Sequence, residues 1–240
     1  MKRYIQGLAV FLVSGLVLGF VGFPLQTAFG AVGLAATELL TLGMALAAAV
    51  ICRLPLREVC PSGKVGPRQV GGFFLLYIAG QNLATLLTWL TTLVTPEVSG
   101  RLEEVEQLTR MPLWVAIPVV AILPAGCEEF LFRGVLRRLF ADLPPMATAL
   151  VVGLLFGAFH LDVYRLVPTA VLGVAITYLC VKTDNFYLAV GYHLLNNLLA
   201  VLSSHFEGAV PSVAVGGPIG WLVIGICCFI LAGRILTKEQ

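Results

Sequence analysis

Long apolar segments, separated by short breaks rich in polar residues, glycine and proline, dominate this chain. A helix needs about 20 mostly apolar residues, within a range of about 17–25, to cross the hydrocarbon core of a bilayer. Eight segments reach or approach this length, although the fifth and the sixth are short. They are 4–23, 31–51, 70–94, 112–136, 146–161, 166–181, 186–204 and 218–236. The pattern predicts an all-α, polytopic membrane protein with about eight transmembrane helices.

The amino-acid composition excludes a soluble globular domain. Hydrophobic residues make up 59% of the chain and charged residues 12%, whereas soluble domains are about 45–50% apolar and about 25% charged. The net charge of +2, without any strongly basic stretch, argues against a nucleic-acid partner. We expect a single integral membrane domain, residues 1–240, with the lipid bilayer as its surroundings.

The lysines and arginines in the breaks indicate how the chain is oriented. Loops on the cytoplasmic side of a membrane carry an excess of these residues. If the N-terminus lies inside, eleven of them fall on the inner side and only Arg101, Arg110 and Arg165 on the outer side, leaving aside Arg133, which belongs to a motif. Both termini are therefore predicted to be cytoplasmic. The first segment follows a basic start, as in a signal peptide, but no A-x-A site follows, so we expect a retained first helix.

Ionisable residues within the predicted spans are candidates for function, because such residues are costly in a membrane. We assign them to three groups, of which the first lies in the fourth span. Glu129 and Arg133 are four residues apart and can form an ion pair on one helix face, whereas Glu128 points about 100° away. One glutamate would then be neutralised, and the other would be free to act as a base in a low-dielectric cavity. A purely structural ion-pair network is the alternative.

The other two groups place polar side chains at helical spacing. His160 ends the motif "FGAFH" of the fifth span, four residues after Phe156. In "GYHLLNN" of the seventh span, His193 and Asn197 share a face and offer two hydrogen-bond donors, which suits an oxyanion hole. The alternative is a polar pair that holds helices together, and Asn196 is expected to serve packing. A glutamate base, a histidine that orients water and an oxyanion pair together form a hydrolytic site.

The three motifs resemble those of a known family. "EEFLFR" fits E-E-x-x-x-R, "FGAFH" fits F-x-x-x-H and "HLLNN" fits H-x-x-x-N. Their order, spacing and eight-helix setting are similar to the CPBP family of CAAX proteases and bacteriocin-processing enzymes, which includes the type II CAAX prenyl endopeptidases. The resemblance covers residues 112–203, the expected catalytic core, and the remaining spans carry no signature.

The resemblance implies an intramembrane endopeptidase that acts on membrane-anchored, lipidated or apolar proteins. It implies that Glu128 and His160 activate a water molecule, that His193 and Asn197 stabilise the oxyanion, and that the predicted ion pair supports the site. No cofactor is expected, because the chain has no H-E-x-x-H pair. The alternative is a zinc protease that uses Glu128, His160 and His193 as ligands.

Three further interpretations stay open as alternatives. A transporter or proton relay would also carry Glu, His and Asn within its spans, but we find no internal repeat of the kind that such a fold uses. A non-catalytic immunity protein would be expected to have lost motif residues, and all of them are present. Cys127 beside the glutamates could be a nucleophile, although a buried cysteine is usually inert. The compact chain suggests the plasma (inner) membrane of a prokaryote, and neither the substrate nor the oligomeric state follows from it.

The predicted topology contains a conflict of depth. The fourth span runs inward and places Glu128 in its inner half, whereas the fifth runs outward and places His160 near its outer end. Two residues that activate one water molecule must lie at one depth. Either the fourth helix is long and tilted, the fifth begins deep in the membrane, or the predicted boundaries are wrong. We also expect a polar funnel between the fourth, fifth and seventh helices, through which water enters.

Overall fold

The described chain is helical throughout and carries no strand. The structure, a computed structural model, describes residues 2–95, 111–206, 212 and 214–237. Its helices, with π-helical segments labelled η, are α1 (Lys2–Val17), η1 (Leu18–Gly22), α2 (Phe23–Ile51), α3 (Leu56–Val59), α4 (Pro67–Val94), α6 (Leu113–Ala116), η3 (Ile117–Ile122), α7 (Leu123–Glu129), η4 (Phe130–Leu136), α8 (Arg137–Leu139), α9 (Pro145–Phe159), α10 (Val163–Thr183), α11 (Phe186–His205) and α12 (Gly217–Thr237).

The first two predicted spans form a helical hairpin. The backbone of Gly30 has a φ of +53°, in the left-handed region that glycine adopts readily, and the chain reverses its direction there. After the turn, the hydroxyl of Thr37 donates a hydrogen bond to the carbonyl of Gly22. A Cβ atom on Gly33 would lie 1.9 Å from the carbonyl oxygen of Leu25, so the two helical limbs of the hairpin, before and after the turn, touch through their backbones. The limbs correspond to the predicted segments 4–23 and 31–51.

All eight predicted segments fall on helices, and the protein is a multi-pass membrane protein. Six described helical stretches are long and apolar enough to cross a membrane, with the hairpin Lys2–Ile51 counted as one of them. The fifth segment, α9, has 15 residues and is shorter than a full span. The number of crossings and the cytoplasmic side of the termini stay predictions.

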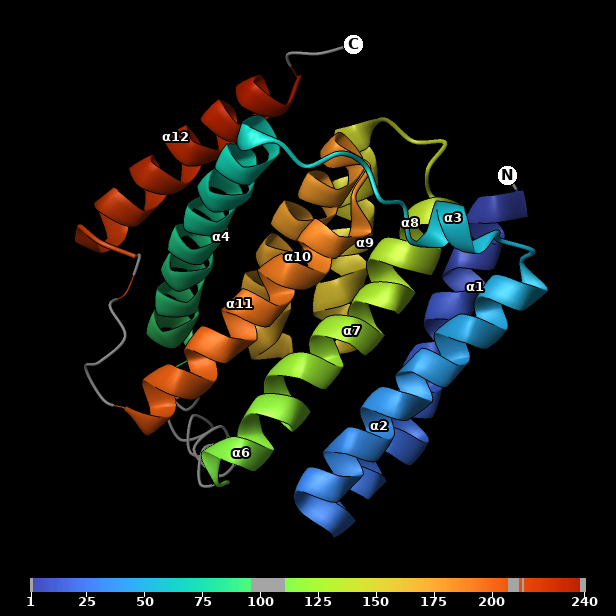
Figure 1. Cartoon of the computed structure of the whole chain (residues 1–240). Coiled ribbons are helices and arrows are strands. Elements are labelled where there is room, and N and C mark those ends of the chain that lie inside the picture. Colours follow the sequence, from blue (N-terminus) through green and yellow to red (C-terminus); the bar gives the residue numbers. More distant parts are fainter. Residues whose placement is uncertain (1, 96–110, 207–211, 213, 238–240) are drawn as a thin grey trace.

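The helices pack side by side in one bundle (Figure 1). The hairpin of α1 and α2 forms one edge, α4 and α12 form the other, and α7 lies between α2 and α11. The start of α1 and the end of α12 lie at the same end of the bundle, as the predicted common side of the termini requires (Figure 1). Among the basic residues used for that prediction, Arg101, Arg110 and Lys238 lie outside the described residues.

Helices α9 and α10 make the closest backbone contact in the part of the bundle that carries the motifs. A Cβ atom on Gly153 would lie 2.5 Å from the backbone nitrogen of Val174, and one on Gly157 would lie 2.4 Å from the carbonyl oxygen of Leu166. Glycine therefore allows the two helices to approach closely, as small residues do in membrane helix pairs. This contact fixes the last turn of α9, and with it His160, relative to α10.

Candidate active site

The predicted ion pair is present and completely buried. Arg133 Nη1 donates to Glu129 Oε1 at 2.7 Å, and both side chains are 0% exposed. The other guanidinium nitrogens donate to Thr177 Oγ1 at 3.1 Å and to the carbonyl of Gly173 at 3.0 Å. The guanidinium carbon also lies 4.4 Å from the centre of the Phe156 ring. Because a buried charge must be paired and hydrogen-bonded, these contacts fix η4 against α9 and α10.

His193 connects helix α11 to this ion pair. Its Nδ1 lies 2.8 Å from Glu129 Oε1, and its Nε2 lies 3.1 Å from Asn197 Nδ2 and 4.0 Å from Glu128 Oε2. The ion-paired carboxylate of Glu129 can only accept hydrogen bonds, so Nδ1 carries the proton that is shared with it. The Nε2 of the neutral ring then accepts from Asn197. The structure thus brings His193 between the two adjacent glutamates.

Glu128 differs from its neighbour as the sequence predicts. Its side chain is 13% exposed, and no described residue donates a hydrogen bond to its buried Oε2. Glu129 Oε1, in contrast, receives hydrogen bonds from both Arg133 and His193, although Glu129 Oε2 also has no donor among the described residues. Glu129 is therefore held through its Oε1, whereas Glu128 is not held in this way, and the catalytic role of Glu128 stays a prediction.

Asn197 is held by three neighbours. Its Nδ2 donates to the carbonyl of Val120 at 3.0 Å and to His193 Nε2, and its Oδ1 accepts from Asn196 Nδ2 at 3.0 Å. Asn196 in turn accepts from Gln81 Nε2 at 2.6 Å. The expected His–Asn pair is thus assembled, but in this state Asn197 donates to His193 itself and not toward a third point. Asn196, expected to serve packing alone, also forms part of the polar network.

His160 lies beside this group and shares the Phe156 ring with His193. Its Nδ1 lies 2.9 Å from the carbonyl oxygen of Phe156, so Nδ1–H donates there, and in a neutral ring Nε2 is an acceptor. The Phe156 ring lies 5.0 Å from the His160 ring and 5.7 Å from the His193 ring, measured between ring centres. No hydrogen bond or ion pair joins His160 to Glu128 among the described residues. One aromatic ring therefore separates the two histidines.

The short length of α9 removes the conflict of depth. A helix rises about 1.5 Å per residue, so the 15 residues of α9 rise about 22 Å, whereas the 27 residues of Leu113–Leu139 rise about 40 Å. Helix α9 thus ends within the bundle and not at the far surface. His160 follows its last turn at the level where Phe156 contacts Arg133 and His193. The fifth predicted segment is therefore shorter than a full span.

Glu38 is a fourth ionisable group that the sequence analysis omitted. It lies on α2, on the buried face that also carries Thr37 and Thr41, and it is 6% exposed. Helix α2 packs against α7, and Glu38 interacts electrostatically with Glu128. No donor from the described residues reaches its Oε2. The signal was available, because Glu38 is an acidic residue within the predicted span 31–51, and the division into three groups was therefore incomplete.

The alternative zinc ligands are not assembled in this arrangement. No three His, Cys, Asp or Glu side chains of the described residues are grouped closely enough to hold a metal ion, and this includes Glu128, His160 and His193. All six cysteines, which are within the described part of the chain, are free.

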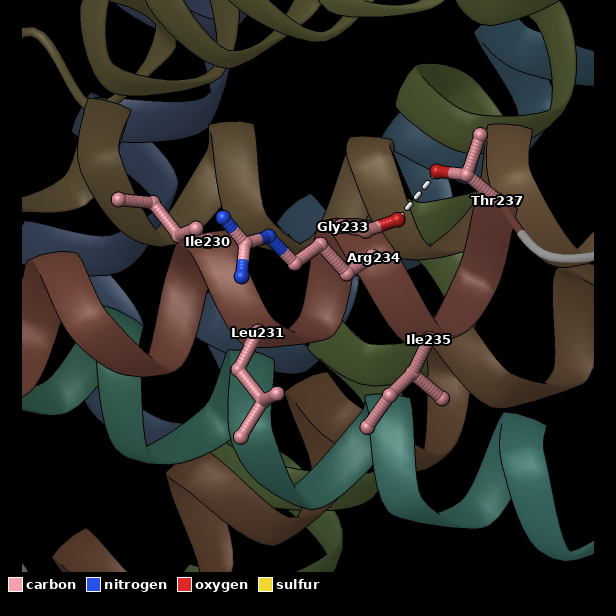
Figure 2. A pocket seen from close by; sticks show the side chains of 6 residues that line it. All are labelled: Ile230, Leu231, Gly233, Arg234, Ile235 and Thr237. Atoms are coloured by element: carbon pink, nitrogen blue, oxygen red, sulfur yellow. Dashed lines mark hydrogen bonds between the residues drawn. The ribbon is translucent and has the colours of Figure 1, made fainter.

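Two hollows on the molecular surface have no motif residue in their lining. One, of about 650 Å³, runs along the end of α12 and is lined by Ile230, Leu231, Gly233, Arg234, Ile235 and Thr237 (Figure 2). The other, of about 390 Å³, lies between α4 and α10 and includes Gln81. Neither is lined by Glu128, His160 or His193, so the polar funnel between the fourth, fifth and seventh helices stays a prediction.

Comparison with known families agrees with the motif geometry. A family model described as type II CAAX prenyl endopeptidase Rce1-like matches residues 110–199. This segment is Rce1-like. It contains all three motifs and the helices from α6 into α11, and it makes the chain similar to CAAX-type membrane peptidases. No curated protein and no solved structure matches the chain.

Proposed function

We propose that this protein is an intramembrane endopeptidase in which Glu128 activates the attacking water molecule. The observation that carries the proposal is the unequal environment of two adjacent glutamates. Arg133 and His193 both contact Glu129 Oε1, whereas Glu128 has no ion pair with an arginine or lysine among the described residues and its Oε2 lies 4.0 Å from His193 Nε2. A carboxylate that is desolvated but not ion-paired is suited to general base catalysis. The Rce1-like segment supports a peptidase of this kind.

The remaining residues fit the steps of peptide hydrolysis. Glu128 takes a proton from water as the water oxygen bonds to the scissile carbonyl carbon. His160 orients this water through the Nε2 that its bond to Phe156 leaves as an acceptor. When the C–N bond breaks, Glu128 returns the proton to the leaving amine, and the products are a carboxylate and an amine.

Stabilisation of the oxyanion requires a rearrangement of the His–Asn pair. Both Nδ2 hydrogens of Asn197 are used in the resting state, by Val120 and by His193. If His193 takes up a proton from solvent at Nε2 before the carbonyl carbon is attacked, its bond to Asn197 breaks, because both partners are then donors, and the proton returns to solvent after the products leave. Each would then direct one N–H toward the oxyanion, and removal of one such donor typically lowers the rate by about 10²–10³.

The proposed substrates are membrane-anchored, lipidated or apolar proteins in the plasma membrane of a prokaryote. The motif residues lie inside the bundle, so a cleavage site that is already held at the bilayer reaches them without passing through bulk water. The Rce1-like segment supports this substrate class. A peptide leader or the anchored C-terminal tail of a surface protein has the required chemistry.

The test compares hydrolysis by the purified protein and by Glu128→Gln. The assay offers apolar and prenylated C-terminal peptides in detergent or lipid. Loss of a general base is expected to lower kcat by about 10²–10⁴ with KM nearly unchanged, whereas the exposed control Asp142→Asn retains full activity. Retained turnover in Glu128→Gln would reject the proposed base.

A chelator added to the same assay tests the zinc alternative. The proposed chemistry predicts unchanged turnover in a strong chelator and no dependence on added zinc. Loss of activity that stoichiometric zinc restores would replace the water-activation scheme with metal-assisted hydrolysis by the same residues.

A further inference from the structure

A chain of side-chain hydrogen bonds leads from the hollow between α4 and α10 to the buried ion pair. Gln81 Nε2 donates to Asn196 Oδ1 at 2.6 Å, and Asn196 Nδ2 donates to Asn197 Oδ1 at 3.0 Å. Asn197 Nδ2 lies 3.1 Å from His193 Nε2, and His193 Nδ1 lies 2.8 Å from Glu129 Oε1. The side chains of three helices, α4, α11 and α7, are thereby joined in one series.

An acceptor at the buried end of the series and a donor at the Gln81 end agree on one direction for every bond. Glu129 is ion-paired and only accepts, so His193 donates through Nδ1 and its neutral ring accepts at Nε2. Asn197 must then present its NH₂ group to His193, which leaves its oxygen facing Asn196. By the same argument Asn196 presents its NH₂ group to Asn197 and its oxygen to Gln81. Gln81 must therefore be a donor.

The orientation of the Asn197 carboxamide matters for the proposed chemistry. A carboxamide has nearly the same shape after a rotation of 180°, so packing alone selects poorly between its two orientations. Only the NH₂ group can stabilise an oxyanion, whereas the carbonyl oxygen would repel it. The carbonyl of Val120 accepts the second Nδ2 hydrogen and supports the same orientation from another side.

We propose that Gln81 and Asn196 are positioning residues that fix the orientation of Asn197 and, through it, the protonated nitrogen of His193. The inference rests on the proposed function and deepens it, because neither residue touches the substrate. Gln81, at the end of the series away from the buried ion pair, is accessible to substitution. Gln81 lines the hollow of about 390 Å³ together with Thr85, Thr88, Trp89 and Pro168, and it is only half-buried.

The first test substitutes Gln81 with two side chains of similar length and compares hydrolysis. Gln81→Met removes the donor and lets Asn196 and Asn197 rotate, whereas Gln81→Lys keeps a donor for Asn196 Oδ1. We expect Gln81→Met to lower kcat roughly tenfold, less than the about 10²–10³ for loss of an oxyanion donor itself, with KM unchanged. Gln81→Lys and the control Thr85→Val, in the same hollow, should stay close to the original kcat.

The second test observes the protonated nitrogen of the His193 imidazole directly by NMR and does not depend on turnover. With ¹⁵N-labelled histidine, the nitrogen resonances of His193 should show a single Nδ1–H tautomer in the unsubstituted protein and in Gln81→Lys. Gln81→Met should show a mixture of protonation states. Assignment uses variants of the other two histidines, His160→Gln and His205→Gln.

The outcomes separate the inference from the function on which it rests. Equal kcat and equal His193 resonances in Gln81→Met and the unsubstituted protein would overturn the positioning role, as would a Gln81→Lys variant that is impaired as much as Gln81→Met. If the unsubstituted protein hydrolyses no peptide, the proposed function fails. The ¹⁵N spectra then decide on the hydrogen-bond series alone.

Discussion

Three glutamates of the described residues lie within the long apolar helices, and each has a different environment. Glu129 is ion-paired and 0% exposed, Glu128 is partly exposed beside His193, and Glu38 is 6% exposed on α2 with an oxygen that receives no hydrogen bond from the described residues. A buried polar group without a partner costs about 1–3 kcal/mol. Residues that lower stability in this way are concentrated at functional sites. We therefore place Glu38 in the same functional group as Glu128.

Replacement of Glu38 by an apolar residue is expected to raise the stability of the protein and to lower its activity. Glu38→Met removes the unsatisfied oxygen and should raise the melting temperature in detergent by a few degrees, since about 1 kcal/mol corresponds to about 2–4 °C in a chain of this size. Turnover should fall, because the charge environment of Glu128 changes. The lipid-facing neighbour Leu39→Met is the control. A destabilised variant with full activity would contradict this assignment.

At the scale of the elements, the contact between α9 and α10 positions the motif side chains. Gly173, on α10, accepts the hydrogen bond from Arg133, and Phe156, on α9, contacts both Arg133 and His193. The helices can approach because Gly153 has no side chain at the point of contact. The π-helical segment η4 begins directly after Glu129 and carries Arg133, and such segments are frequent at functional sites. Helix packing and helix irregularity together build the buried ion pair.

A single methyl group at Gly153 should separate these helices. In Gly153→Ala the new Cβ would lie 2.5 Å from the backbone nitrogen of Val174, which cannot move aside as a side chain could. Overpacking of this kind costs about 1–3 kcal/mol, and turnover should fall as well. Gly126→Ala is the matched control, because no atom lies within 4 Å of its Cβ position. Equal melting temperatures for the two variants would show that the contact is not tight.

At the scale of the molecule, the segment between α2 and α4 connects helices that are far apart in sequence. The carboxylate of Glu58 accepts a hydrogen bond from Arg138, and its backbone carbonyl accepts one from Arg137 at 2.8 Å. The carbonyl of Gly63 accepts from Asn185 at the start of α11. The hydrogen bond from Arg138 holds the pKa of Glu58 below its usual value. These contacts fasten one end of the bundle, where α8 and α11 meet the segment.

The lowered pKa of Glu58 predicts a specific loss of stability in acid. A carboxyl whose pKa is lower in the folded state stabilises the protein fully above its unfolded pKa, close to 4.5, and this contribution is lost as the pH falls through the folded pKa. Melting temperatures measured from pH 7 downward should therefore decrease below about pH 4.5 less steeply in Glu58→Gln than in the unsubstituted protein. Asp142→Asn is the control, and parallel curves for all three proteins would refute the prediction.

The apolar segments and the helical spacing of the motifs determine a large part of this protein. A segment of about 20 apolar residues has no stable alternative to a helix in a bilayer, since every backbone polar group must be satisfied within it. The spacing of four residues between Glu129 and Arg133 follows from helix geometry alone, and the structure contains the expected ion pair. The Rce1-like match to residues 110–199 agrees with the resemblance that the motifs indicate.

Contacts between helices that are distant in the sequence are decided only by the tertiary structure. The partial depth of α9, the position of Glu38 beside α7 and the connection from Gln81 to Asn197 all depend on which helix faces point toward one another. Helical periodicity identifies residues that share a face, but it contains no information on the neighbour of that face. Burial and hydrogen bonding between helices determine which faces pack together, because a buried polar side chain needs a hydrogen-bond partner, which here lies on another helix.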